Sequence, residues 1–284
     1  MKTGNLHSSK PKSPPKRALA AAFEEEDRPD SPSKKVRTTP KPVSRPMLVE
    51  SHPPTPQRSI SPETKALVNL MRIESDRLRD EATKMKRSLD SLFNASHSGS
   101  EIVLAVATGV DSVLCYMLSF AYMDEVRRLS ERGHHGFWAG LIAVLEMVEA
   151  KTRSFAEIHA ALRHLGVVVR SKAHENNLSQ TGVTDELLSS FRKGWRELGR
   201  ATEEARNYGT EHEMGRSLPL TWAKRNTGKH RLEHALPGKL KGDFWLPMTP
   251  LSSSPIEAIR FGLAALAEWT EIKKVKYNAT CKFD

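Results

Sequence analysis

Apolar residues follow a helical spacing from about residue 61 onward. Ser61, Pro62 and Glu63 are typical of a helix start, because serine caps the first turn, proline suits the first position and an acid suits the positive end of the helix dipole. The apolar positions that follow recur every three, four or seven residues: Leu67, Leu70, Met71, Leu78, Met85, Leu89 and Leu92. This spacing predicts an amphipathic helix of about 30 residues that ends before Ser98, and this helix is a natural candidate for an interface.

A second helix is predicted from about Ser100 to Arg132, and it is apolar on nearly every side. A helix with this pattern is expected to be buried at the centre of a domain. The glycines and histidines of residues 133–136 end it, and a third helix starts near Phe137. Ser154 and Glu157 have the spacing of a capping box, which predicts the start of a fourth helix.

The chain after the fourth helix predicts a loop at residues 176–182 and a fifth helix from near Thr184 to Asn207. The apolar spacing within this helix indicates which side chains face the core. These expected inward positions are Leu187, Leu188, Phe191, Trp195 and Leu198. The fifth helix is therefore expected to pack along one apolar stripe, with its charged residues exposed.

Glycines and prolines interrupt residues 209–250, so this stretch is expected to be irregular. A last helix is predicted from Pro255 onward, with Ser253 or Ser254 as its cap. No segment has the alternation of a strand. The predicted fold class is all-α: consecutive antiparallel helices that form either a bundle or a solenoid of helix pairs of the tetratricopeptide kind.

Residues 1–60 differ in composition from the rest of the chain. Twelve of the 17 prolines lie before residue 63, together with many serines, threonines and lysines. Residues 1–60 carry 12 Lys and Arg against 6 Asp and Glu, which gives +6 of the whole-chain net charge of +10. Such a composition cannot bury enough apolar surface to offset its ordering entropy. We therefore predict a disordered basic arm over residues 1–60 and one helical interaction domain over residues 61–284.

Two basic clusters in this arm have the arrangement of a two-part nuclear import signal: Lys16 and Arg17, then Lys34, Lys35 and Arg37. They predict a nuclear location, although the same charges could simply keep the arm soluble. Five Ser-Pro or Thr-Pro steps are candidate phosphorylation sites: Ser13, Ser31, Thr39, Thr55 and Ser61. A phosphate at Ser31 would weaken the neighbouring basic cluster through its negative charge.

The two cysteines, Cys115 and Cys281, predict neither a disulfide framework nor a zinc site, and a reducing compartment is expected. The N-terminus lacks the apolar core of a signal peptide. From the sequence we expect no apolar run to reach the length of about 20 residues that spans a bilayer. The sequence therefore predicts a soluble intracellular protein with no membrane partner.

Only one catalytic motif finds a formal match in the sequence. Residues 230–234, with His230, Glu233 and His234, fit the H-x-x-E-H pattern of inverted zinc peptidases. Neighbouring lysines and arginines would oppose a bound cation, so a zinc hydrolase is a remote alternative. His159 and His164 are five residues apart on a helix, a spacing that favours separate histidines in the core or at the surface over a metal pair. We predict no enzymatic activity, no catalytic residue and no cofactor.

Basic residues gather around a tryptophan in the stretch predicted to be irregular. They form a candidate nucleic-acid or phosphate patch: Trp222, Lys224, Arg225, Lys229 and Arg231. Such a group can combine backbone contacts with stacking, but it contains no ordered recognition motif. The alternative function that it predicts is sequence-nonspecific nucleic-acid binding by an accessory protein.

Two segments of the helical region resemble the C-terminal homology domain of the AF-four/FMR-two family. The first is Leu70–Ala82, a charged helix with a methionine near its start and a basic residue before leucine. The second runs from Pro250-Leu251-Ser252-Ser253 into a helix with Ile259, the pair Gly262-Leu263 and Trp269. The order of the two segments and the helix-rich interval between them also agree with the family.

This resemblance implies a function as well as a fold. Family members are scaffolds of the super elongation complex, which assists RNA polymerase II, and their domain is tetratricopeptide-like, dimerises and can contact nucleic acid. The implied protein is a compact, fungal-type version that acts as a non-enzymatic nuclear scaffold in transcription elongation. Its implied partners are nuclear proteins such as ELL-type elongation factors and a second copy of the chain. No partner-binding residue carries over from the family.

Overall fold

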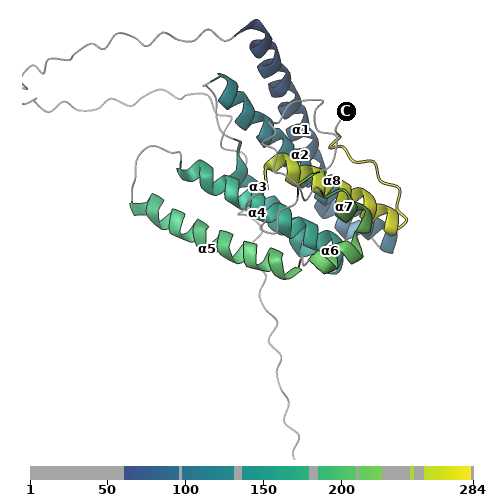
Figure 1. Ribbon diagram of the computed structural model, residues 1–284. Coiled ribbons are helices and arrows are strands. Elements are labelled where there is room, and N and C mark those ends of the chain that lie inside the picture. The colour runs from purple at the N-terminus through teal and green to yellow at the C-terminus, as the bar shows by residue number, and fades with distance from the viewer. Residues whose placement is uncertain are drawn as a thin grey trace, which may run out of the picture. The chain divides into compact units, whose positions relative to one another are not determined.

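The computed structural model describes residues 61–95, 98–130, 136–178, 185–208, 211–225, 244–245 and 253–282. The chain divides into two units, Met1–Arg58 and Ser59–Asp284, and all described residues belong to the second. Their regular structure is helical, which confirms the all-α prediction (Figure 1). The helices are α1 (Pro62–Ala95), α2 (Gly99–Ser130), α3 (Trp138–Thr152), α4 (Ala156–Leu178), α5 (Asp185–Tyr208), α6 (Glu211–Ser217), α7 (Pro219–Ala223) and α8 (Pro255–Ile272).

Helices α1 and α2 form an antiparallel pair in which small side chains meet at regular intervals. Ser75 of α1 lies opposite Ser119 of α2, and each hydroxyl lies within 3.1 Å of the other residue's carbonyl oxygen. Seven residues further along α1, Ala82 accepts a hydrogen bond of 3.0 Å from the Ser112 hydroxyl. Met71, Leu78 and Leu89 of α1 are thus buried against the core, whereas Leu70 and Ile73 remain exposed, so the expected interface on this helix stays a prediction.

The prediction that α2 is the central buried helix is confirmed, since most of its residues from Val103 to Val126 are buried. Contrary to the sequence prediction, α2 is also long and apolar enough to cross a membrane, and 83% of its apolar window is buried inside the domain. Asp111 lies near its middle, fully buried and hydrogen-bonded to the C-terminal segment. Burial against the neighbouring helices accounts for the apolar composition of α2 without a membrane.

A carboxylate of α2 binds the residues at which α3 begins. Asp124 accepts hydrogen bonds from the Gly136 backbone N–H at 2.8 Å and from the Trp138 indole N–H at 2.7 Å. Gly136 lies so close to α2 that a Cβ atom there would meet Phe120 Cβ at 2.5 Å. The side-chain amide of Asn176, near the end of α4, donates to the Gly136 carbonyl oxygen. A glycine is therefore required at this corner.

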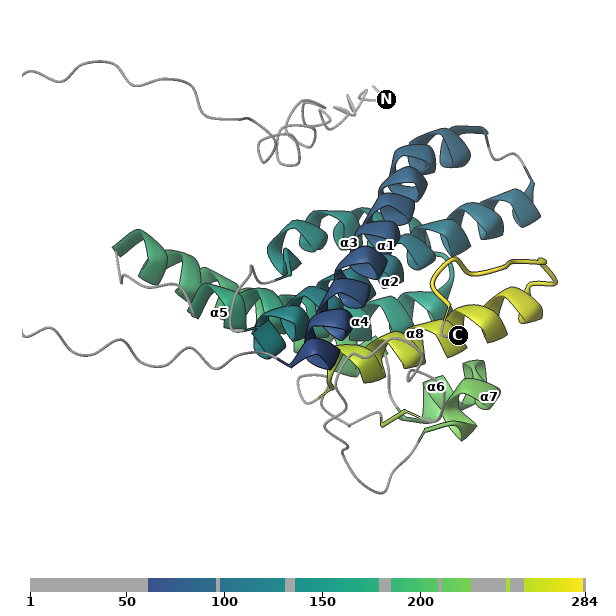
Figure 2. The same ribbon diagram turned by 90° about the horizontal axis from the view of Figure 1, so that it is seen from above.

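Helix α8 closes the core by packing against both α2 and α4 (Figure 2). Ser254 is its cap and forms a capping box with Glu257, as the sequence predicts. Gly262 faces Leu114 of α2, and a Cβ atom there would lie 2.6 Å from the leucine side chain. Because this last helix contacts helices far from it in sequence, α1 to α4 and α8 share one core instead of stacking only on their neighbours.

Three details differ from the sequence prediction. Helix α4 continues to Leu178, through part of the stretch expected to be a loop. The region expected to be irregular contains two short helices, α6 and α7, and Glu268 of α8 accepts hydrogen bonds from the backbone N–H groups of Leu220 and Thr221 at the start of α7. Trp195 of α5, expected to face the core, is 61% exposed. Trp195 is therefore accessible to solvent on the outer part of α5.

Candidate functional site

Helix α5 lies along α4 and is joined to it by a small apolar cluster. Leu198, Ala201 and Ala205 of α5 are buried together with Val167 of α4. An ion pair reinforces this seam, since the Arg163 guanidinium of α4 lies 2.8 Å from the Glu204 carboxylate of α5 and 3.2 Å from the Glu149 carboxylate of α3. The buried seam fixes which side of α5 faces outward.

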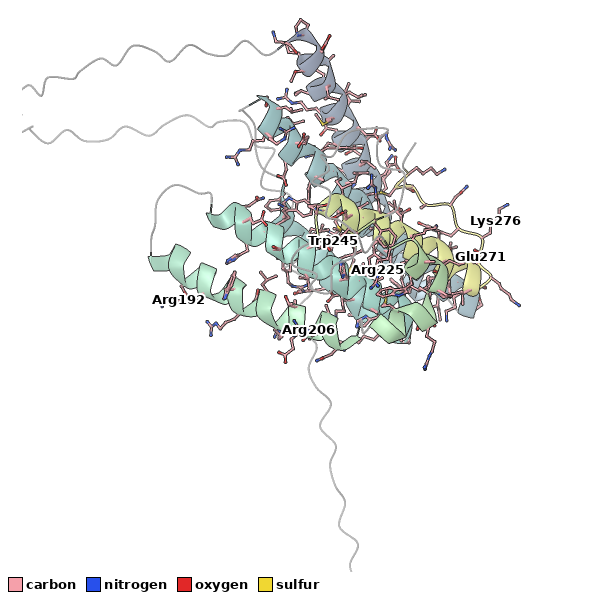
Figure 3. The ribbon with its side chains drawn as sticks, viewed as in Figure 1. Arg192, Arg206, Arg225, Trp245, Glu271 and Lys276 are labelled. Carbon is pink, nitrogen blue, oxygen red and sulfur yellow. The ribbon has the colours of Figure 1, made fainter. Side chains whose placement is uncertain are left out.

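The outward side of α5 carries a row of arginines. Arg192, Arg196 and Arg200 follow one another at intervals of four residues, and all three are exposed. Arg206 continues the exposed basic surface one to two turns later. Figure 3 labels Arg192 and Arg206 near the two ends of α5. Residues four apart lie on one face of a helix, about 6 Å apart along its axis, so the arginines form a continuous stripe.

Trp195 lies at the edge of this arginine stripe. Its ring centroid is 5.3 Å from that of His174, a buried residue of α4, so the indole is supported from below while 61% of the residue stays exposed. An exposed tryptophan held against a neighbouring helix offers a flat apolar surface at low entropic cost. We call Arg192, Trp195, Arg196, Arg200 and Arg206 the α5 face.

The charge balance of the α5 face is positive. Lys193 lies 4.0 Å from Glu197, an ion pair on the flank of the face. Glu203 is an exposed carboxylate between Arg200 and Arg206. Within the part of the chain that the structure describes, no carboxylate lies within 4.0 Å of the four arginines of the face. Their guanidinium groups are therefore available to a ligand that carries carboxylates or phosphates.

The predicted patch around Trp222 is only partly described, because Lys229 and Arg231 lie outside the described residues. Trp222 is half-buried and packs against the core, and the Arg225 guanidinium lies 4.0 Å from its ring centroid. Lys224 is exposed. Since Arg225 covers Trp222, the described part of this patch is poorly placed for stacking on a base.

The remaining predicted sites are distributed as follows. Three groups of predicted sites lie outside the described residues. They are the import residues Lys16, Arg17, Lys34, Lys35 and Arg37, the phosphorylation candidates Ser13, Ser31, Thr39 and Thr55, and the motif at residues 230–234. Ser61 is described, and its hydroxyl accepts a hydrogen bond from the Thr64 backbone N–H at 3.2 Å. Ser61 is therefore both the cap of α1 and a candidate phosphorylation site.

The two histidines of α4 belong to the core. His159 lies 2.9 Å from the Thr152 hydroxyl, and His164 lies 3.1 Å from the Ser253 hydroxyl. Burial lowers the pKa of both imidazoles, that of His164 to about 4. No group of three or more potential metal ligands occurs among the described residues. These two histidines thus serve packing, in agreement with the sequence interpretation.

The α5 face was not identified from the sequence, although its signal is present there. Arg192, Arg196 and Arg200 have a regular spacing of four, but Trp195 was assigned to the core because it is apolar. No family model, no curated protein and no solved structure matches this chain.

Proposed function

We propose that this chain is a non-enzymatic nuclear scaffold of the RNA polymerase II elongation machinery, which binds partner proteins and self-associates. The observation that carries the protein-binding role is the α5 face, where an exposed tryptophan lies beside arginines with no described carboxylate partner. Tryptophan and arginine are the residue types that contribute most to protein interfaces. A partner that fits this surface carries acidic side chains around an apolar anchor.

The placement in transcription elongation rests on the resemblance to the AF-four/FMR-two domain. Several residues that carry the resemblance lie in packing positions: Met71 and Leu78 are buried in α1, Gly262 contacts α2, and Trp269 is fully buried against Phe155. These buried residues support a fold similar to that of the family domain and identify no partner-binding surface. The two basic clusters of residues 1–60 support the nuclear location.

Affinity purification from nuclei tests the scaffold proposal. The tagged full chain is expected to recover elongation factors, including an ELL-type protein, and a chain in which Arg192, Arg196 and Arg200 are replaced by Gln is expected to recover them at least several-fold less. A matched control replaces three exposed cations of α1, Lys65, Arg72 and Arg87, by Gln and should behave like the wild type. Failure of the wild-type chain to recover any elongation factor would defeat the proposal.

Sequence-nonspecific binding of single-stranded nucleic acid is the second candidate function. It is favoured by the same face, because arginines along a helix can contact successive phosphates while an exposed indole stacks on a base. The α5 face is better suited to this role than the Trp222 group, whose indole is covered by Arg225. In this function the basic residues of the chain's first sixty positions would add electrostatic attraction.

Fluorescence anisotropy with a labelled single strand of mixed sequence distinguishes the two functions. If nucleic acid is the ligand, the logarithm of the affinity falls linearly with that of the salt concentration, and the triple Gln variant of Arg192, Arg196 and Arg200 lowers the slope by about 2. The triple variant of α1 serves again as the control with the same change in charge. Equal slopes for all three proteins would exclude nucleic-acid binding by the α5 face.

A further inference from the structure

The C-terminal segment, residues 273–282, returns from the end of α8 to the middle of α2 (Figure 2). Asp111 of α2 holds it through three hydrogen bonds. The Asp111 carboxylate accepts from the Tyr277 hydroxyl at 2.9 Å, the Thr280 backbone N–H at 2.6 Å and the Cys281 backbone N–H at 3.0 Å. Asp111 is fully buried, so these hydrogen bonds replace its contacts with water and fix the backbone on either side of Cys281.

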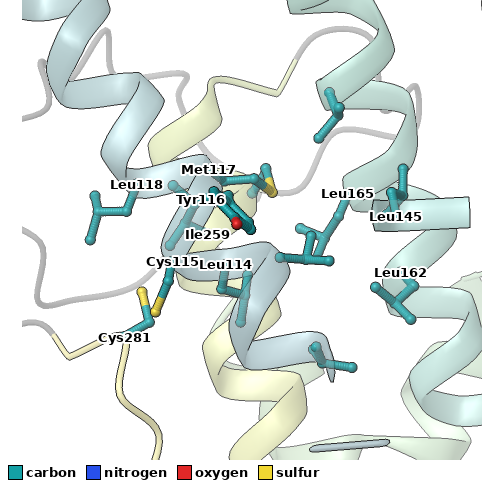
Figure 4. Close-up of a cluster of buried hydrophobic side chains, with 14 of the residues drawn as sticks. Leu114, Cys115, Tyr116, Met117, Leu118, Leu145, Leu162, Leu165, Ile259 and Cys281 are labelled. Atoms are coloured by element: carbon teal, nitrogen blue, oxygen red, sulfur yellow. The ribbon is translucent and has the colours of Figure 1, made fainter. Parts of the chain in front are cut away.

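This arrangement brings the two cysteines of the chain together. Cys115 follows Asp111 by one helical turn, and its sulfur lies 3.7 Å from the Asp111 Oδ1 atom that also accepts from the Cys281 N–H. The side chains of Cys115 and Cys281 approach each other, and their sulfur atoms lie side by side in Figure 4. Both residues are buried free thiols, with 0% and 1% of their surface exposed.

We propose that Cys115 and Cys281 form a disulfide site that fastens the C-terminal segment to α2 when the protein meets an oxidising small-molecule disulfide. Oxidised glutathione is the class of oxidant. The thiolate of one cysteine attacks a glutathione sulfur, and glutathione leaves as a thiolate that takes a proton. The second cysteine then displaces the remaining glutathione. Two protein thiols become one disulfide, and one molecule of oxidised glutathione becomes two of reduced glutathione.

The surroundings of the pair make this reaction dependent on local opening. The neighbouring Cys281 thiol and burial raise the pKa of the Cys115 thiol, so little thiolate forms while the segment stays in place. The oxidant also reaches neither sulfur in the closed state, because both are buried. Opening of residues 277–282 exposes the thiols, and reclosing on Asp111 returns them to bonding position. The disulfide then reduces the conformational entropy of the unfolded chain, and this stabilises the folded state.

Oxidation of the purified full chain tests the site. After incubation with excess oxidised glutathione, the protein is expected to lose two hydrogens in mass, to lose both free thiols, and to yield one peptide pair linked through Cys115 and Cys281. Its melting temperature should rise by several degrees and return after reduction with dithiothreitol. A stable mixed disulfide with glutathione, or thiols that remain free in mild denaturant, would overturn the proposal.

Two variants separate the site from general effects of oxidation. Cys281→Ser keeps a small polar side chain but cannot form the bond, so oxidant should leave its melting temperature unchanged. Tyr277→Phe removes one hydrogen bond to Asp111 and retains both cysteines. In this variant the segment of residues 277–282 should open more often, and the two thiols should be oxidised at least several-fold faster than in the wild type. An unchanged oxidation rate in Tyr277→Phe would contradict the dependence on opening.

Discussion

His164 in the middle of α4 and Ser253 just before α8 are joined by a buried hydrogen bond, with 3.1 Å between the imidazole Nε2 and the serine Oγ. The imidazole also packs edge-on against Phe261 of α8, with ring centroids 5.1 Å apart. Burial alone lowers the pKa of His164 to about 4, because the imidazolium form would lose its hydration inside the core. The contact between α4 and α8 therefore depends on a neutral histidine.

The stability of the protein is expected to fall in mild acid because of His164. Its pKa is 6.5 when unfolded and about 4 when folded, so the unfolded chain takes up the proton first. The free energy of unfolding is therefore highest above pH 6.5. It falls by about 3 kcal/mol as the pH is lowered toward 4. Urea unfolding at several pH values measures this. His164→Gln, which keeps a nitrogen near Ser253, should show a correspondingly flatter profile. A profile equal to that of the wild type would contradict the assignment.

The paired serines of α1 and α2 predict a non-additive mutational effect. Ser119→Ala removes one partner and leaves Ser75 buried with fewer hydrogen bonds, so the free energy of unfolding should fall by about 1–3 kcal/mol. The double variant Ser75→Ala, Ser119→Ala removes both hydroxyls and should lose less than the sum of the two single changes. Urea unfolding of the four proteins gives the coupling energy, and strict additivity would argue against the pair.

Gly136→Ala should destabilise the corner between α2 and α3. The added methyl would lie 2.5 Å from Phe120 Cβ and 2.8 Å from the Phe120 carbonyl oxygen, and neither atom can move without shifting α2. We expect a loss of about 1–3 kcal/mol by thermal or urea unfolding. Gly199→Ala is the control, because open space surrounds Gly199 and alanine favours the helix. Similar losses in both variants would show that the corner is not specifically strained.

Ser61 should contribute to stability as the cap of α1. Ser61→Ala removes the acceptor for the Thr64 N–H and is expected to cost about 1 kcal/mol. Ser91→Ala is a suitable comparison, since Ser91 is exposed within α1 and its hydroxyl only bonds back to the Ser88 carbonyl oxygen. That change should be neutral or slightly stabilising, because alanine is the better helix former. Circular dichroism at increasing urea concentration measures the free energy of unfolding of both variants. Equal changes in the two variants would contradict a capping role for Ser61.

Much of the fold follows from local patterns in the sequence. The Ser254 cap is read from the spacing to Glu257, and the burial of α2 is read from its uniformly apolar composition. Trp195 was misassigned, because helical spacing identifies apolar positions without showing which of them the neighbouring helix covers. The proximity of Cys115 and Cys281 is not visible in the sequence either, since it is produced by Asp111 binding a distant segment.

The attachment of α5 through one small seam has a consequence for its motions. Among the side chains that the structure describes, this seam of Val167, Leu198, Ala201 and Ala205 buries much less apolar surface than the core around α2, so we expect less free energy to oppose detachment of α5. Amide protons of α5 are therefore expected to exchange with deuterium well before those of α2. A ligand on the α5 face would slow this exchange, so hydrogen exchange can report binding even where the partner leaves the backbone geometry unchanged.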